Sequence, residues 1–193
     1  MRRRGEELEN GILEAAWRQL EEEGYERFSF DAVAQRAGTS KPVLYRRWSH
    51  REALLLALLQ HQWQTQPVEV PDTGSLRGDI LSLLRSASRL RRAMVAVMSV
   101  RLSAYYAETG KTPDLLRREV LGDRTTSMDI IVSRATDRGE IPPGLPQRVV
   151  TLPFDLFRHE AVMTLAEVPD AVIVEIVDVI FLPLVKSLTP GNM

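Results

Sequence analysis

The sequence predicts an all-α protein. Apolar residues recur at three- and four-residue spacings over most of the chain, which is the period of a helix with one buried face. Between residues 75 and 188, no segment of useful length alternates apolar and polar residues with the period of two that a strand requires. The 193 residues are 44% hydrophobic and 26% charged, which is typical of a folded globular protein.

The first helix is expected over residues 6–23, where Gly24 marks its end. Its inner face is formed by apolar residues at helical spacing, namely Leu8, Ile12, Ala15, Ala16 and Leu20. This face predicts that the helix packs against the elements that follow.

A second and a third short helix are expected next, joined by a tight turn. Ser29 can cap the second helix, because its hydroxyl can accept a hydrogen bond from a backbone N–H of the first turn. Gly38 supplies the permissive backbone of the turn, and Thr39 or Ser40 can cap a third helix over residues 41–47. Two helices joined by so short a turn must cross steeply.

The third helix has an apolar inner side and a mixed outer side. At about 100° per residue, Leu44 and Trp48 fall on the inner side and anchor the helix. The outer side and its edges carry Lys41, Pro42, Val43, Tyr45, Arg46 and Arg47. Apolar side chains of this kind can meet thymine methyl groups in a major groove, and guanidinium groups can reach guanine or phosphate. The helix therefore has the composition of a DNA-reading element.

Charge is unevenly distributed, although the net charge is only −1. Glu6–Glu26 contains eight acidic residues and one basic residue, whereas Arg27–Arg51 contains six basic residues and one acidic residue. Such a basic segment suits contact with DNA phosphates, which releases condensed counterions. A solvated basic surface without a partner is the alternative interpretation.

Residues 28–54 resemble the helix-turn-helix signature of the TetR family of transcriptional regulators. The resemblance extends over roughly the first 65 residues and depends on Ala34, Ala37, Gly38, Leu44, Tyr45, Trp48, Glu52 and Leu55. It implies base contacts from Lys41, Pro42, Val43 and Arg47, and phosphate contacts from Ser29, Tyr45 and Arg51. We add Arg46, Thr39 and Ser40 to the expected DNA-facing residues.

Two positions depart from the pattern of this family. Arg51 stands where lysine is usual, which preserves the charge. His50 stands where a small capping residue is usual, so the cap of the next helix is not evident from the sequence.

The expected domain organisation is a three-helix DNA-binding domain over residues 1–49, a connecting helix over 50–66 and a helical domain over 67–193. Further helices are expected from Ser75 to about Leu90, and near residues 92–108, 113–138, 146–166 and 170–188. The resemblance implies that this second domain serves dimerisation and ligand binding.

The last expected helix, Ala171–Leu188, has little polar surface, so it must bury a second side against another element. A core helix in a monomer is one interpretation. The resemblance implies the other, in which the last two helices pair with those of a second copy as a four-helix bundle. A two-fold dimer would also suit a palindromic operator on double-stranded DNA.

Two groups of residues in the expected helical domain suggest a ligand pocket. Met94, Met98, Arg101 and Tyr105 follow one another at helical spacing, which places a guanidinium on an apolar stripe. Phe154, Phe157 and Arg158 could complete the pocket for an anionic effector. The alternative is ordinary core packing, with Arg101 paired to an internal acid.

Catalysis is not expected, and neither is a cofactor or a metal site. The chain has three histidines, no cysteine, no nucleophile elbow and no zinc-protease or phosphate-binding motif. Its longest apolar runs are too short to span a membrane, so a cytoplasmic location is expected. The sequence thus predicts a ligand-responsive repressor, with a ligand-independent regulator or an architectural DNA-binding protein as the alternative.

Overall fold

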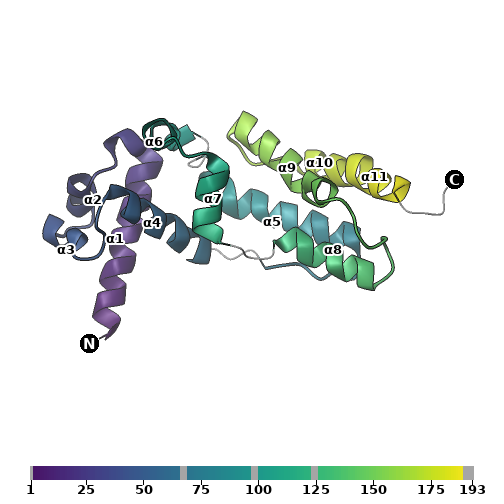
Figure 1. Cartoon of the computed structure of the whole chain (residues 1–193), viewed down its shortest axis with the longest axis horizontal. Coiled ribbons are helices and arrows are strands. Elements are labelled where there is room, and N and C mark those ends of the chain that lie inside the picture. The colour runs from purple at the N-terminus through teal and green to yellow at the C-terminus, as the bar shows by residue number, and fades with distance from the viewer. Residues whose placement is uncertain (1, 66–68, 97–99, 123–125, 189–193) are drawn as a thin grey trace. The chain divides into compact units, whose positions relative to one another are not determined.

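The computed structural model describes residues 2–65, 69–96, 100–122 and 126–188, and every regular element within these ranges is a helix (Figure 1). The all-α prediction is therefore confirmed. The chain forms two compact units. One consists of residues 1–67 and 96–123, and the other of residues 68–95 and 124–193. The segment 96–123 thus packs with the N-terminal helices.

The first unit begins with α1 (Arg2–Glu23), the short 3₁₀ helix η1 (Tyr25–Arg27), α2 (Phe30–Arg36), α3 (Lys41–Tyr45) and α4 (Arg51–Thr65). The α1 helix buries Ile12, Ala16 and Leu20 completely, as its periodicity predicts. Leu8 is 40% exposed, so the buried face is shorter than expected. The α1 helix packs against both α2 and α4, so α1 holds these three helices together.

The turn between α2 and α3 has the expected local chemistry. Ser29 caps α2, because its Oγ accepts a hydrogen bond from the backbone N–H of Ala32 at 3.2 Å. Gly38 has φ 62°, a left-handed conformation that glycine adopts without steric cost. The chain then re-enters a helix at Lys41, with Ser40 at the N-cap position. This turn fixes the direction in which α3 leaves α2.

Two further helices complete the first unit, α6 (Ser103–Thr109) and α7 (Pro113–Leu121). The prediction of one helix over 92–108 is wrong. Leu102 (φ −98°, ψ 9°) leaves the helical conformation and is the N-cap residue of a separate helix, α6. The expected helix over 113–138 is also wrong. Gly122 ends α7 at φ 65°, and a capping box formed by Thr126 and Asp129 begins another helix.

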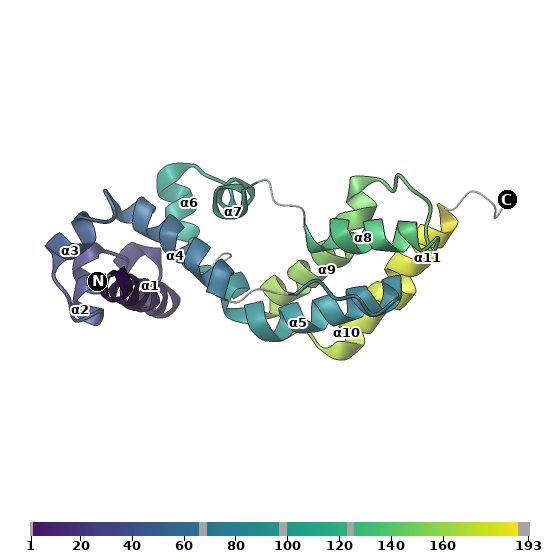
Figure 2. The same cartoon turned by 90° about the horizontal axis from the view of Figure 1, so that it is seen from below.

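The second unit contains α5 (Leu76–Ala96), α8 (Ser127–Asp137), α9 (Gln147–Thr164), α10 (Asp170–Val174), a π-helical segment η3 (Glu175–Phe181) and α11 (Leu182–Ser187). The last three follow one another without a break as one helical rod (Figure 2). Pro183 has no N–H to donate, and the wider π turns directly precede it. The sequence pattern predicts the rod but not this local widening.

Two ion pairs join α5 to the rod. Arg77 contacts Asp178 through two hydrogen bonds of 2.7 Å, and Arg85 contacts Asp170 through two of 2.5 and 3.0 Å. The arginines and the aspartates are each eight residues apart and pair in opposite order, so α5 and the rod run antiparallel. One side of the rod is consequently covered by its own unit.

Asp79 is the buried polar residue near the start of α5, with no exposed surface. Its Oδ1 accepts hydrogen bonds from the backbone N–H of Thr73 at 2.5 Å and from the Thr73 hydroxyl at 2.8 Å. Its Oδ2 lies 3.2 Å from Nη2 of Arg138, which follows α8. The carboxylate therefore ties the loop before α5 to the end of α8.

Candidate nucleic-acid interface

The third helix ends at Tyr45, two residues before its predicted end, but both predicted anchors are buried, Leu44 within α3 and Trp48 just after it. Leu44 has no exposed surface and Trp48 is 7% exposed, so both belong to the core of the first unit. Because Leu44 points inward, the opposite side of α3 must face outward. This geometry presents a short helical surface to a partner.

Pro42, Tyr45 and Arg46 are exposed on or beside this outer side, and Val43 is half-buried. The Arg46 side chain makes no hydrogen bond or ion pair with any residue in the described ranges. At the start of α3, Lys41 Nζ donates to Asp31 Oδ2 at 2.8 Å, and this hydrogen bond raises the pKa of Lys41. The outer side therefore carries one uncompensated cation and one that is held by a carboxylate.

Arg47 lies differently from its neighbour. Its Nη2 donates to the backbone carbonyl of Gly5 at 3.4 Å, and its Nε is 3.6 Å from Glu9 Oε2. The Nε atom is buried and has no hydrogen-bond partner among the described residues. The structure thus turns this guanidinium toward α1, and it must leave Glu9 to reach DNA.

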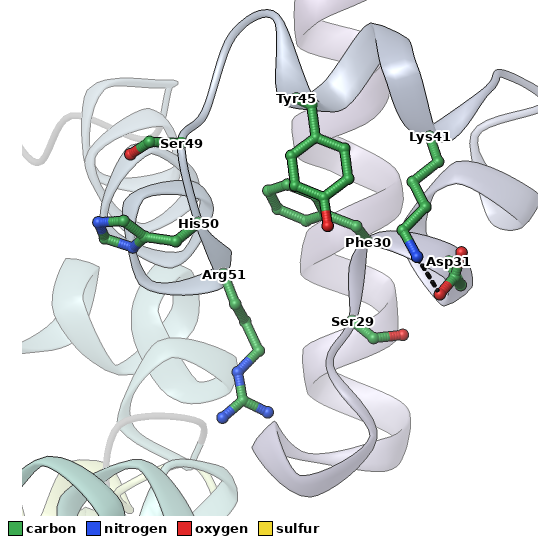
Figure 3. Close-up of a pocket in the computed structure, with 8 residues that line it drawn as sticks. All are labelled: Ser29, Phe30, Asp31, Lys41, Tyr45, Ser49, His50 and Arg51. Atoms are coloured by element: carbon green, nitrogen blue, oxygen red, sulfur yellow. Dashed lines mark hydrogen bonds and ion pairs between the residues drawn. The ribbon is translucent and has the colours of Figure 1, made fainter.

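A hollow of about 300 Å³ lies beside α3 (Figure 3). It is lined by Ser29, Phe30, Asp31, Lys41, Tyr45, Ser49, His50 and Arg51. Ser29, Tyr45 and Arg51, for which the resemblance implies phosphate contacts, are therefore brought together. Phe30, Ser49 and His50 were not predicted to lie here.

Phe30 and Tyr45 form the aromatic part of the hollow. Their rings meet edge to face with centroids 4.6 Å apart, while Tyr45 remains 54% exposed. The contact orients the phenol ring of Tyr45 and leaves its hydroxyl free to donate to a phosphate oxygen. Thr39 is half-buried and Ser40 is exposed just before α3, and the Ser40 side chain makes no capping hydrogen bond.

His50 provides the cap that the sequence left undefined. Its Nδ1 accepts a hydrogen bond from the backbone N–H of Ala53 at 3.2 Å, at the start of α4. The ring nitrogen takes the place of the usual hydroxyl or amide oxygen, and it can accept only while it carries no proton.

Removing this cap should destabilise the first unit. We expect His50→Ala to lower the free energy of unfolding by about 1 kcal/mol, because the first turn of α4 loses a hydrogen-bond acceptor. His50→Asn should retain most of the stability, since an amide oxygen is a good cap. Urea unfolding of the three proteins measures the difference, and equal midpoints for all three would show that the imidazole does not cap α4.

Two sequence profiles match the chain. The profile of bacterial regulatory proteins of the tetR family matches residues 12–58, which include α2 and α3. The profile of the tetracyclin repressor-like C-terminal domain matches residues 70–180. This chain belongs to the TetR family of transcriptional regulators. It is therefore a DNA-binding regulator, and the resemblance seen in the sequence is confirmed.

Individual relatives agree with this assignment of the TetR-family chain. It is 29% identical to the DNA-binding transcriptional repressor TetR of Mycobacteroides abscessus, over 95% of this chain and 96% of the relative. It is also 29% identical to the HTH-type transcriptional regulator AqdR of Rhodococcus erythropolis, over 77% and 71% of the two chains.

A solved structure shares the fold of this TetR-family chain. It is the regulator FadR from Bacillus subtilis in complex with stearoyl-CoA, with a TM-score of 0.69, 16% identity and coverage of 87% of this chain and 97% of that one. The flavonoid-responsive regulator FrrA gives a TM-score of 0.61 at 19% identity, covering 96% and 98%.

The residues suggested for a ligand pocket in this TetR-family chain fall in different units. Arg101 is exposed in the first unit, so the expected cation on a buried stripe is wrong, because the helix that would create the stripe is interrupted at Leu102. Tyr105 is fully buried in the same unit, and its hydroxyl donates to Glu52 at 3.0 Å. Burial raises the pKa of Tyr105 to about 12. Met98 and the side chain of Met94 lie outside the described residues.

The other suggested residues lie on α9 in the second unit. Phe157 is in the hydrophobic core, with its ring 5.6 Å from that of Phe154. Arg158 is exposed and pairs with Asp155 at 3.0 Å. These contacts are those of a packed helix with a solvated edge.

The described ranges contain no group of three or more histidine, aspartate or glutamate residues that could hold a metal ion. None of the helices described is long and apolar enough to cross a membrane.

Proposed function

We propose that this TetR-family chain is a homodimeric repressor that reads its operator with α3 and is released from it by a small-molecule effector. The observation that carries the DNA-binding part is the orientation of α3. Leu44 and Trp48 are buried on one side, and Pro42 and Arg46 are exposed on the other. A helix held this way can enter a major groove without rearrangement of the unit.

Each described side chain then has a specific role. We assign base contacts to Lys41, Pro42, Val43 and Arg46, with Arg47 joining them once it leaves Glu9. Ser29, Tyr45 and Arg51 contact phosphates, because they line one hollow beside α3. Thr39 and Ser40 lie at the start of the reading helix, where they can contact the DNA backbone.

The second copy is proposed to pack on the C-terminal helices. Several large apolar side chains of the second unit are exposed there, namely Met163, Leu165, Val179, Ile180 and Leu188. An exposed apolar surface on an otherwise well-packed unit favours association. A two-fold dimer would place two α3 helices about 34 Å apart, facing two half-sites of a palindromic operator.

The effector proposal is supported by similar proteins. FadR was solved with stearoyl-CoA, and FrrA is described as flavonoid-responsive. An effector that prefers the conformation unable to bind DNA would weaken operator binding by about 5- to 150-fold, for a coupling of roughly 1–3 kcal/mol. A regulator that works without a ligand would show no shift in operator affinity with any compound.

Replacing Arg46 tests the reading role of α3. We expect Arg46→Ala to weaken binding to a selected operator by about 1–3 kcal/mol, and to weaken binding to a random duplex much less. Arg18→Ala is the matched control, because it removes the same charge from an exposed side chain of the same unit, on α1 rather than at the end of α3.

Fluorescence anisotropy with both duplexes measures these affinities. Equal losses on the operator and on the random duplex would mean that Arg46 contacts only phosphate. No loss on either duplex, or the same loss in Arg18→Ala, would contradict the assignment of α3 as the reading helix.

A further inference from the structure

Arg51 is engaged within the protein before any DNA is present. Its Nη2 forms a hydrogen-bonded ion pair with Oε2 of Glu108, a residue of α6. Its guanidinium also lies over the Tyr25 ring, 4.1 Å from the centroid. The same side chain lines the hollow beside α3, where Figure 3 shows it extended on the other side of Tyr45 from the Lys41–Asp31 pair.

Glu108 comes from a different part of the chain than the other carboxylates at this interface. Asp31 and Glu9, which accompany Lys41 and Arg47, belong to the N-terminal helices α2 and α1. Glu108 lies outside residues 12–58, which the DNA-binding profile matches. The contact therefore adds a residue of the segment 96–123 to the interface.

The position of Glu108 is fixed by its neighbours. One helical turn earlier, Tyr105 is fully buried and donates to Glu52 at 3.0 Å. Lys111 binds the same Glu52 carboxylate at 2.8 Å and Glu119 at 2.8 Å, and its hydrogen bond lowers the pKa of Glu52. Because Glu52 follows Arg51 directly in α4, the network keeps the Glu108 carboxylate beside the guanidinium.

We propose that Glu108 limits DNA affinity by competing with a DNA phosphate for Arg51. The inference rests on the proposed phosphate contact of Arg51. A guanidinium that turns to a phosphate must release or share its carboxylate partner, and a carboxylate left beside the DNA backbone repels it. Both effects oppose binding, and both depend on the Arg51–Glu108 contact.

The size of the effect follows from the exposure of the pair. The two side chains are 34% and 49% exposed, so water and salt screen the interaction. Removing an exposed ion pair of this kind changes an equilibrium constant, here that of DNA binding, by about two- to fivefold. Glu108→Gln should therefore tighten binding to a random-sequence duplex by about two- to fivefold, since a phosphate contact is independent of base sequence.

A double-mutant cycle on the full-length protein separates this contact from general charge effects. Binding to a random duplex at low salt is measured for the wild type, Glu108→Gln, Arg51→Gln and the double variant. Glu26→Gln is the control, because it removes an exposed carboxylate of the same unit that has no partner among the described residues.

The proposal predicts that Glu108→Gln tightens binding only while Arg51 is present, and that its effect in the Arg51→Gln background is no larger than that of Glu26→Gln. Equal tightening in both backgrounds, or no tightening in either, would overturn it. If Arg51→Gln by itself leaves the affinity for DNA unchanged, the phosphate contact proposed for Arg51 is wrong. The proposed competition between Glu108 and DNA is then wrong as well.

Discussion

Replacing Val179 by aspartate is expected to convert the protein to a monomer and to weaken operator binding about 100- to 10,000-fold. Val179 is 65% exposed on η3, next to Ile180, which is 39% exposed. A carboxylate buried without a partner in an apolar interface is strongly unfavourable. A monomer also loses the gain in affinity that comes from engaging two half-sites at once.

Ser133→Asp is the control for this variant. It adds the same charge to an exposed position of α8 in the same unit. Light scattering at micromolar concentration reports the mass of each protein, and anisotropy reports operator affinity. A Val179→Asp protein that remains dimeric and binds the operator normally would show that dimerisation uses another surface.

Asp79→Ala is expected to cost about 3 kcal/mol of stability. The substitution removes the fully buried carboxylate that accepts hydrogen bonds from the Thr73 N–H, the Thr73 hydroxyl and one donor of Arg138. Arg138 keeps its contact with Glu140, so the loss stays below that of a fully isolated buried ion pair.

Asp137→Ala provides the comparison, because it removes an exposed carboxylate from α8 and should change stability by less than about 0.5 kcal/mol. Urea unfolding followed by circular dichroism measures both variants. Equal midpoints for Asp79→Ala and the wild type would mean that the carboxylate does not hold the loop before α5.

The N-terminal helices could be predicted from the sequence because their signals are local. The structural effects of Ser29, of Gly38 and of the apolar pair Leu44 and Trp48 extend over only a few residues. The turn and the buried side of α3 can therefore be predicted from the local sequence. The direction of Arg47 could not be predicted, because Gly5 and Glu9 reach it only in the folded unit.

The interruptions of the later helices were missed for a different reason. Apolar spacing continues through Leu102, so periodicity does not show where the backbone leaves the helix there. At the other break the signals are present in the sequence, because residues 122–127 carry no apolar side chain, Gly122 is a helix-ending residue and Thr126 with Asp129 matches a capping box. Pairing of residues distant in sequence, such as Arg77 with Asp178 and Arg51 with Glu108, is also invisible to local patterns. The His50 cap also left a local signal, namely an unusual residue at a capping position.

Selection of binding sites from a pool of random duplexes tests the central claim most directly. The account predicts that the full-length protein enriches one two-fold symmetric sequence, and that Arg46→Ala relaxes the preference at defined base pairs of each half-site. Enrichment of no sequence by the folded protein, or an unchanged preference in the variant, would contradict the assignment of α3 as the reading helix.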